Sequence, residues 1–272
     1  MRIAREVATL DSVGVGDHVC WLVAPGDDYD GTARSYLASG QRAGDKMLVI
    51  GAPQSHWLEQ SLPQGLLVDP VAERAKGQGW DAEALLGLVR REAHTAGQQG
   101  FRALRVLAQM DRMWPGGVSA RELARHEMRL DILVASRAAI VVCSYPRESF
   151  SASALEQVAG VHPHQAGRGV QMHDFRMFSV GSDCWRVSGV VDIVGAAAFG
   201  TAVRELLAST STLSLHCHDL QLMDAAAMQT LAEAALSIKG RKVLIEGANP
   251  TVRRNWSLAG YDAPQIPVEL VP

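Results

Sequence analysis

Short apolar runs alternate with amphipathic stretches along the first half of the chain. Each run is long enough for one strand, and together they cover residues 18–24, 45–53, 101–110 and 138–145. Between them, apolar residues recur at spacings of three and four over 81–96, which predicts a helix, and a second helix is expected over 119–136. Continuous apolar strands separated by such helices indicate a mainly parallel sheet with helices on both faces.

The pattern changes near Gly167. Two short strand-like stretches flank Gly181, an arrangement typical of a hairpin rather than of a helical crossover. Helix and strand signals then alternate up to residue 259, with one helix directly after Asp224. We therefore predict an α/β protein of two domains, with the larger parallel sheet in residues 1–166 and a smaller α/β domain in residues 167–272.

Composition narrows the classes of partner. The 272 residues are 47% hydrophobic and 20% charged, with a formal net charge of −3, which lacks the basic excess of nucleic-acid binders. No apolar run approaches the roughly 18 residues that a membrane helix needs, and residues 1–14 lack the apolar core of a signal peptide. The four cysteines are scattered without a CxxC pair. We expect a cytoplasmic protein with neither a nucleic-acid nor a membrane partner.

Three segments of the predicted second domain carry a family resemblance. They are VSGVVDI at 187–193, the stretch from Leu220 to Asp224, and residues 240–262. In this order they resemble the STAS domain, the fold of anti-sigma factor antagonists. In that family the turn after the aspartate carries a serine or threonine that a partner kinase phosphorylates. The resemblance implies that Ala225 and Ala226 occupy a lost phosphorylation site.

The same resemblance implies a docking face for an anti-sigma factor or a regulatory kinase-like protein. Its residues are Asp224, Ala225, Ala226, Ala227 and Met228. A phosphate would add almost two negative charges at this helix start, and alanine cannot accept one. The domain is then either permanently binding-competent or no longer controlled by such a kinase. A plainer alternative stays open, in which Asp224 is a helix cap and the alanines are good helix formers.

Four segments of the first domain carry a second resemblance. GDHVCWL at 16–22, residues 101–114, residues 122–131 and residues 141–163 resemble, in order, the MEDS domain. That family comprises sensory domains of the DcmR type that are distantly related to the RecA/KaiC core. One position departs from it, because Gln109 stands where the family often has an acidic residue.

The MEDS resemblance implies sensing of a small organic, hydrocarbon-like molecule. Ligands of doubly wound sheets lie beyond the carboxyl ends of the strands, in pockets with aromatic walls and a few polar groups. The candidate ligand-binding residues are His18, Trp21, Asp111, Met113, Trp114, Tyr145 and Arg147. The alternative is that the aromatic residues belong to the core and that Arg147 is a surface cation.

Motifs for cofactor or metal chemistry are absent or incomplete. The chain has no GxxxxGK[ST] motif, and Asp27, Asp28 and Asp30 after the first strand would repel a triphosphate. His216 and His218 share one face of a strand and would need further ligands from elsewhere. Cys143 lies within an apolar strand, where a thiol is usually inert. We therefore expect no cofactor and no metal.

These observations favour a non-enzymatic signalling protein, with a sensory MEDS-like domain and a partner-binding STAS-like domain. Two rival hypotheses remain open. One is a scaffold, which predicts a homo-oligomer without a ligand, and the other is a degenerate RecA-type nucleotide-binding enzyme.

Overall fold

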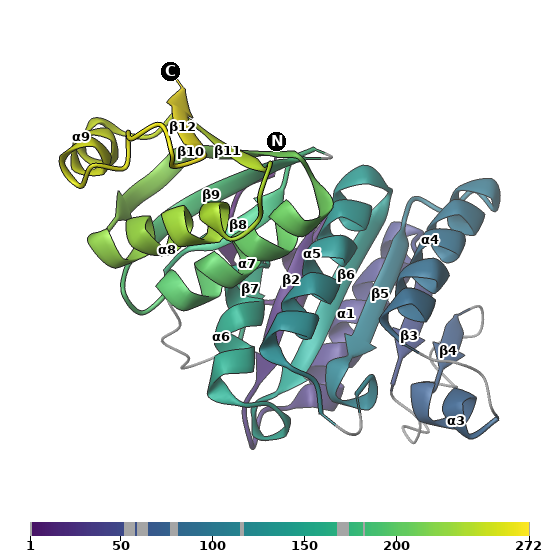
Figure 1. Cartoon of the computed structure of the whole chain (residues 1–272). Helices are drawn as coiled ribbons and strands as arrows, with labels where there is room; N and C mark the ends of the chain where they lie inside the picture. Colours follow the sequence, from purple (N-terminus) through teal and green to yellow (C-terminus); the bar gives the residue numbers. More distant parts are fainter. Residues whose placement is uncertain are drawn as a thin grey trace. The chain divides into compact units, whose positions relative to one another are not determined.

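The computed structural model describes residues 2–51, 58, 65–76, 81–114, 117–167, 174–181 and 183–271 (Figure 1). It divides into two compact units. The first unit comprises Met1–Val118, Leu133–Ser151 and His164–Val170, and the second comprises Ser119–Ile132, Ala152–Pro163 and Gln171–Pro272. Within the described part of the chain, no helix combines the length and apolarity needed to cross a membrane.

The described strands of the first unit form a seven-stranded, fully parallel sheet. In spatial order these strands are β1 (Arg5–Glu6), β7 (His164–Ala166), β2 (His18–Val23), β6 (Ala139–Pro146), β5 (Leu104–Gln109), β3 (Lys46–Ile50) and β4 (Leu66–Val68). This confirms the predicted parallel sheet. The strand expected to reach Pro53 ends at Ile50, and residues 52–53 lie outside the described part.

Helices connect these strands. They are α1 (Tyr29–Ala43), α3 (Pro70–Ala75), α4 (Ala82–Gln98) and α5 (Ala120–Ser136), with short 3-10 turns at η1 (Leu10–Ser12), η2 (Met110–Arg112) and η3 (Arg147–Ser149). Helix α1 begins where the Asp28 carboxylate accepts a hydrogen bond from the Gly31 amide, and it ends at Gly44, whose φ of +75° favours glycine. Helix α1 covers the face of the sheet that carries Val19, Trp21 and Val142.

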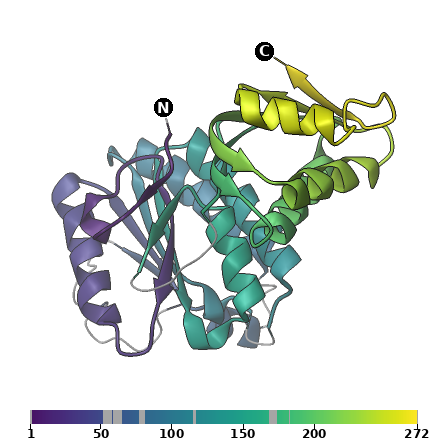
Figure 2. The ribbon, with the colours of Figure 1, turned by 90° about the vertical axis from the view of Figure 1, so that its left-hand side faces the viewer.

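The second unit contains a mixed sheet of five described strands. Their order is β12 (Val268–Val271), β11 (Lys242–Glu246), β10 (Thr212–Met223), β9 (Cys184–Val191) and β8 (Arg176–Ser179). Strands β8 and β9 pair in antiparallel fashion around Gly181, as the hairpin pattern predicted, and the other pairs are parallel. The helices are α7 (Ala196–Ser209), α8 (Ala225–Leu236) and α9 (Pro250–Leu258), together with α6 (Ala152–Gly160) and most of α5 (Figure 2).

The core of the second unit draws on residues that are far apart in the chain. Phe199 of α7 packs edge to face on Phe175, with ring centroids 5.9 Å apart. Met128 of α5 and Val161 after α6 belong to the same buried cluster. The predicted boundary near Gly167 therefore separates, along the sequence, segments that share one core.

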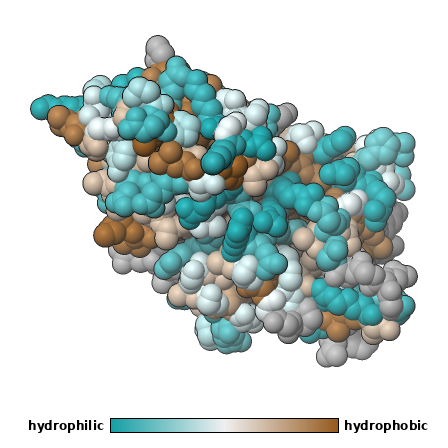
Figure 3. All heavy atoms as spheres, in the orientation of Figure 1, coloured by the Kyte–Doolittle hydropathy of each residue, from teal (hydrophilic) through white to brown (hydrophobic). Residues whose placement is uncertain are grey.

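The outer face drawn in Figure 3 shows hydrophobic residues in separate groups between hydrophilic ones. Among the exposed large hydrophobic residues, Ile193 and Val194 are adjacent in the chain and are 74% and 61% exposed. Both precede α7, and they lie next to residues that the STAS resemblance singled out.

Candidate functional site

The carboxyl ends of β5 and β6 are neighbours in the first sheet, so η2 and η3 begin at the same edge. Asp111 of η2 is half-buried, and its Oδ1 has no hydrogen-bond partner among the described residues. Burial raises the pKa of the Asp111 carboxyl above its usual value. This oxygen is a buried acceptor for which the described residues supply no donor of hydrogen-bond geometry.

An aromatic pair lies on the α1 face of the same sheet. Trp21 and Tyr29 stack with ring centroids 4.9 Å apart and planes 2° apart, and Tyr29 Oη lies 3.5 Å from Ser144 Oγ. Burial raises the pKa of Tyr29 to about 12, and the nearby charge of Asp111 contributes to this shift. Sequence reasoning identified Trp21 and Asp111 but missed Tyr29 and Ser144, which come together only through strand pairing and the start of α1.

The seven predicted ligand residues do not form one group. His18 and Trp21 point to opposite faces of β2, because side chains alternate along a strand. Tyr145 likewise faces away from Ser144, and it packs edge to face on Phe150 with ring centroids 5.2 Å apart. The remaining candidates differ in burial: Met113 is fully buried, whereas Trp114 and Arg147 are half-buried.

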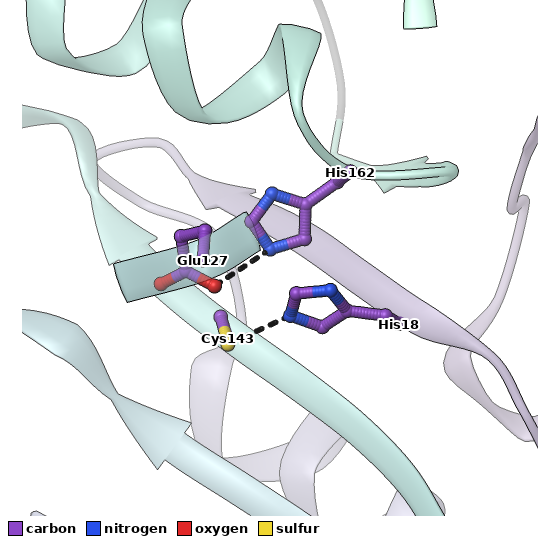
Figure 4. Close-up of side chains that lie close together, drawn as sticks. All are labelled: His18, Glu127, Cys143 and His162. Carbon is purple, nitrogen blue, oxygen red and sulfur yellow. Dashed lines mark hydrogen bonds and ion pairs between the residues drawn. The ribbon is translucent and has the colours of Figure 1, made fainter. Parts of the chain in front are cut away.

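Two buried pairs involve residue types with acid–base or metal-binding chemistry (Figure 4). In the first unit, His18 Nε2 lies 3.6 Å from Cys143 Sγ. In the second unit, His162 Nε2 lies 3.2 Å from Glu127 Oε2, and both side chains are fully buried. His162 Nδ1 lies 2.7 Å from the Val158 carbonyl oxygen, which can only accept, so Nδ1 carries a proton.

The histidines of β10 lie close to side chains of the two neighbouring strands, which the sequence could not identify. His216 Nε2 lies 2.9 Å from Cys184 Sγ on β9 and 3.1 Å from Glu246 Oε2 on β11. The rings of His216 and His218 are 6.3 Å apart. Burial, followed by the charge of Glu246, raises the pKa of the Cys184 thiol, so this thiol stays protonated at neutral pH.

The turn at Asp224 has a clear structural role. Asp224 Oδ1 accepts a hydrogen bond of 2.8 Å from the Ala227 amide, and the Asp224 amide donates to the Val191 carbonyl at 3.1 Å. This is the N-cap of the plainer alternative. Ala227 and Met228 are 0% and 1% exposed and belong to the core, so the expectation that they line the docking face was wrong. Asp224, Ala225 and Ala226 retain accessible surface.

Apolar residues extend this exposed turn. Val191 of β9 pairs with Met223 of β10, which brings the segment after β9 next to Asp224. Ile193 and Val194 in that segment are exposed, and Leu222 before the turn is 40% exposed. We call Ile193, Val194, Leu222, Asp224, Ala225 and Ala226 the docking surface.

Comparisons with known proteins match the chain in two segments. Residues 17–163 match the model of the MEDS family, described as the methanogen/methylotroph, DcmR sensory domain. Residues 181–272 match the family model described as Mlab, STAS domain. A solved structure of the anti-sigma factor antagonist SpoIIAA in its unphosphorylated form matches 31% of this chain and 82% of its own chain, with 15% identity and a TM-score of 0.24. No curated protein matches.

The two family models agree with the order of domains that the sequence motifs predicted. Their descriptions are of sensory and regulatory domain types, and neither is an enzyme family. The MEDS match alone spans more than half of the 272 residues. This chain belongs to the MEDS family and carries a STAS domain after its MEDS segment.

Proposed function

We propose that this protein is a non-enzymatic signalling protein in which a small molecule bound by the MEDS segment changes partner binding by the STAS segment. One observation carries the proposal: Met128 and Val161 of the MEDS segment are part of the same hydrophobic core as Phe199 and Trp185. Protein interiors are close-packed, so a shift of α5 or α6 must be accommodated by the STAS core.

The ligand-binding end of this proposal is the edge of the first sheet near Asp111. Asp111 Oδ1 supplies an acceptor, Trp21 and Tyr29 supply an aromatic stack, and Trp114 is half-buried close to Asp111 in the chain. Such a set suits a small organic molecule with one donor group, such as an alcohol or an amine, attached to an apolar body.

The partner-binding end is the docking surface. An exposed, partly apolar turn without hydroxyl groups at Ala225 and Ala226 suits a protein partner such as an anti-sigma factor or a regulatory kinase-like protein. A nearby hydroxyl, Thr230 Oγ1, already donates to the Ala226 carbonyl at 2.8 Å. Binding at this surface would then be set by the conformation of the domain, since no phosphate can be added at these alanines.

Native mass spectrometry of the full chain, purified from its own cells, tests the sensor assignment. We expect the wild-type chain to retain a small molecule that Asp111→Asn loses, because the neutral amide has one acceptor oxygen in place of two and accepts a hydrogen bond more weakly than a carboxylate. The exposed residue Glu148 provides the matched control, and Glu148→Gln should retain the compound. Equal retention of the compound by all three chains would show that it binds away from Asp111. A wild-type chain that retains no compound, and that no alcohol or amine stabilises, would contradict the sensor assignment.

The rival functions make different predictions. A scaffold predicts a homo-oligomer whose mass does not respond to small molecules, which light scattering can measure. A RecA-type enzyme predicts nucleotide binding, although the sequence contains no GxxxxGK[ST] phosphate loop. Calorimetric titration with ATP and Mg²⁺ distinguishes this rival from the sensor.

A further inference from the structure

Two arginines of α5 hold one buried carboxylate of α7. Arg121 Nε contacts Glu205 Oε1, and Arg125 Nε lies 2.6 Å from Glu205 Oε2. The arginines are one helical turn apart and so share a face of α5. The Glu205 side chain is 2% exposed, whereas the arginine side chains are 63% and 51% exposed. The three residues therefore fasten α5 to α7 at a defined point, which we call the clamp.

The clamp is charged at neutral pH. Burial alone would raise the pKa of Glu205, but the hydrogen bonds from Arg125 and Arg121 outweigh burial and lower it. Hydrogen bonds between ionised groups are roughly twice as strong as neutral ones. A buried carboxylate held in this way resists displacement unless its arginines move with it.

Helix α6 contacts α7 at a second point. The buried Gln157 side chain donates to the Ala198 carbonyl oxygen at 2.9 Å. Ala198 and Glu205 are two helical turns apart, so both contacts lie along one side of α7. Both partner helices belong to the segment that matches the MEDS family. Helix α7 is therefore the helix of the STAS segment that α5 and α6 of the MEDS segment contact.

The N-terminal end of α7, where Ala198 lies, leads to the docking surface. The helix begins at Ala196, and only the N-cap Gly195 separates it from the exposed Ile193 and Val194. Asp192 Oδ1 accepts hydrogen bonds from the Val194 amide at 3.0 Å and the Gly195 amide at 3.2 Å, which fixes this segment to the helix start. From Ala196 to Glu205 the helix spans about 14 Å, at a rise of about 1.5 Å per residue.

Helix α7 also contacts α8 without intervening space. A Cβ added at Gly200 would lie 2.1 Å from Thr230 Cγ2, so only glycine permits this approach. Thr230 in turn donates to the carbonyl oxygen of Ala226, in the first turn of α8. A displacement of α7 thus reaches both halves of the docking surface, through Val194 and through the start of α8.

We propose that α7 transmits the position of α5 to the docking surface, with Glu205 as the positioning residue. This inference rests on the proposed function and specifies its regulation. When α5 shifts, the clamp carries Glu205 with it, and α7 moves as a rigid rod because its helical hydrogen bonds are kept. The segment at Ile193 and Val194 and the Asp224 turn then change their exposure together.

Hydrogen exchange of the full chain, measured without ligand or partner, tests the transmission. Three amides serve as reporters because each has a defined acceptor at the docking surface: Val194, Gly195 and Ala227. In Glu205→Gln we expect all three amides to exchange about fivefold faster. This is the factor expected when the charge-assisted hydrogen bonds between Glu205 and its arginines are weakened. The control is Glu233→Gln, which alters a carboxylate of α8 that accepts from Gln229 on the exposed side and should leave the reporters unchanged.

A rise in exchange confined to α5 and to α7 around Glu205, with unchanged reporters, would overturn the proposal. Arg125→Gln provides a milder variant should Glu205→Gln fail to fold, because Arg121 keeps its contact, and it should raise the same reporters by a smaller factor. Since no ligand is present, this outcome is independent of whether the chain senses a small molecule. Failure of the sensor assignment would appear separately, in the mass spectrometry of Asp111→Asn.

Discussion

The Asp131 Oδ2 atom on α5 lies 2.7 Å from the backbone amide of Ser179 at the end of β8. Both residues are buried, so the aspartate satisfies a donor that water cannot reach. Asp131 lies in the segment that matches the MEDS family, and Ser179 lies in β8, the edge strand of the five-stranded sheet, just before the STAS match begins. A helix from the MEDS segment thus completes the hydrogen bonding of the edge strand that pairs with β9, the first strand inside the STAS match.

Removing this carboxylate should destabilise the second unit. In Asp131→Ala we expect a loss of about 2 kcal/mol in the free energy of unfolding, because the buried Ser179 amide loses its acceptor. Urea denaturation measures it. Ser136→Ala, which removes a hydroxyl that donates to the Leu133 carbonyl of its own helix, should change stability by less than about 0.5 kcal/mol. Equal effects of the two substitutions would argue against this role for Asp131.

Stability should fall in acid through Asp17. Burial raises the pKa of this carboxyl, but the bond to His164, at 3.0 Å, and the Gly14 amide outweigh burial and lower it to about 2. A carboxyl with a lowered folded pKa stabilises the fold above its unfolded pKa, and that contribution disappears as the pH falls from about 4 towards 2. It amounts to at most about 2 kcal/mol, because solvent screens this partly exposed carboxylate. In Asp17→Asn, the dependence of the melting temperature on pH should flatten over this range, and an unchanged slope would contradict the assignment.

The close approach of α7 and α8 should make Gly200 intolerant of a side chain. Gly200→Ala should lower the free energy of unfolding by about 1–3 kcal/mol, because the new methyl group overlaps Thr230. Gly87→Ala in α4 provides the comparison, since its nearest neighbour is the flexible end of Arg91 at 3.3 Å. That change should be neutral or should stabilise by up to about 1 kcal/mol, because alanine favours helix. Thermal denaturation of both variants checks the contrast.

The docking surface should be sensitive to charge. Ala226→Glu should weaken binding of the protein that co-purifies with the wild-type chain at least tenfold, by adding a carboxylate next to Asp224. A carboxylate in the first turn of a helix suits the helix dipole, so folding should be preserved. Gln229→Glu adds the same charge on an exposed position one turn further along α8 and should bind nearly as the wild type does. Calorimetric titration that finds unchanged affinity for Ala226→Glu would exclude this surface.

Local patterns predicted much of the fold. Continuous apolar runs such as the one from Ala138 to Tyr145 became buried parallel strands, because hydrophobic periodicity reports burial directly. The spacing of Ala227, Met228 and Leu231 follows the same rule, and it would have indicated that the first two belong to the buried face of α8. Family resemblance had drawn attention to the turn and away from that periodicity.

Contacts between distant segments could not be predicted in this way. The core shared by Met128 and Phe199, the clamp at Glu205 and the stack of Trp21 on Tyr29 all depend on how elements pack. The acceptor for the Ser179 amide comes from a helix about fifty residues earlier, which no local signal marks. Sequence therefore located the strand ends that carry Asp111, but it could not tell which side chains gather there.

The most direct test of coupling is hydrogen exchange of the full chain with and without an alcohol or amine that raises its melting temperature. We predict that the ligand changes the exchange rates of the Val194, Gly195 and Ala227 amides as well as those near Asp111. In Glu205→Gln, the change at these three amides should be smaller than in the wild type. A response confined to the region near Asp111 would contradict the claim that the MEDS segment controls the docking surface.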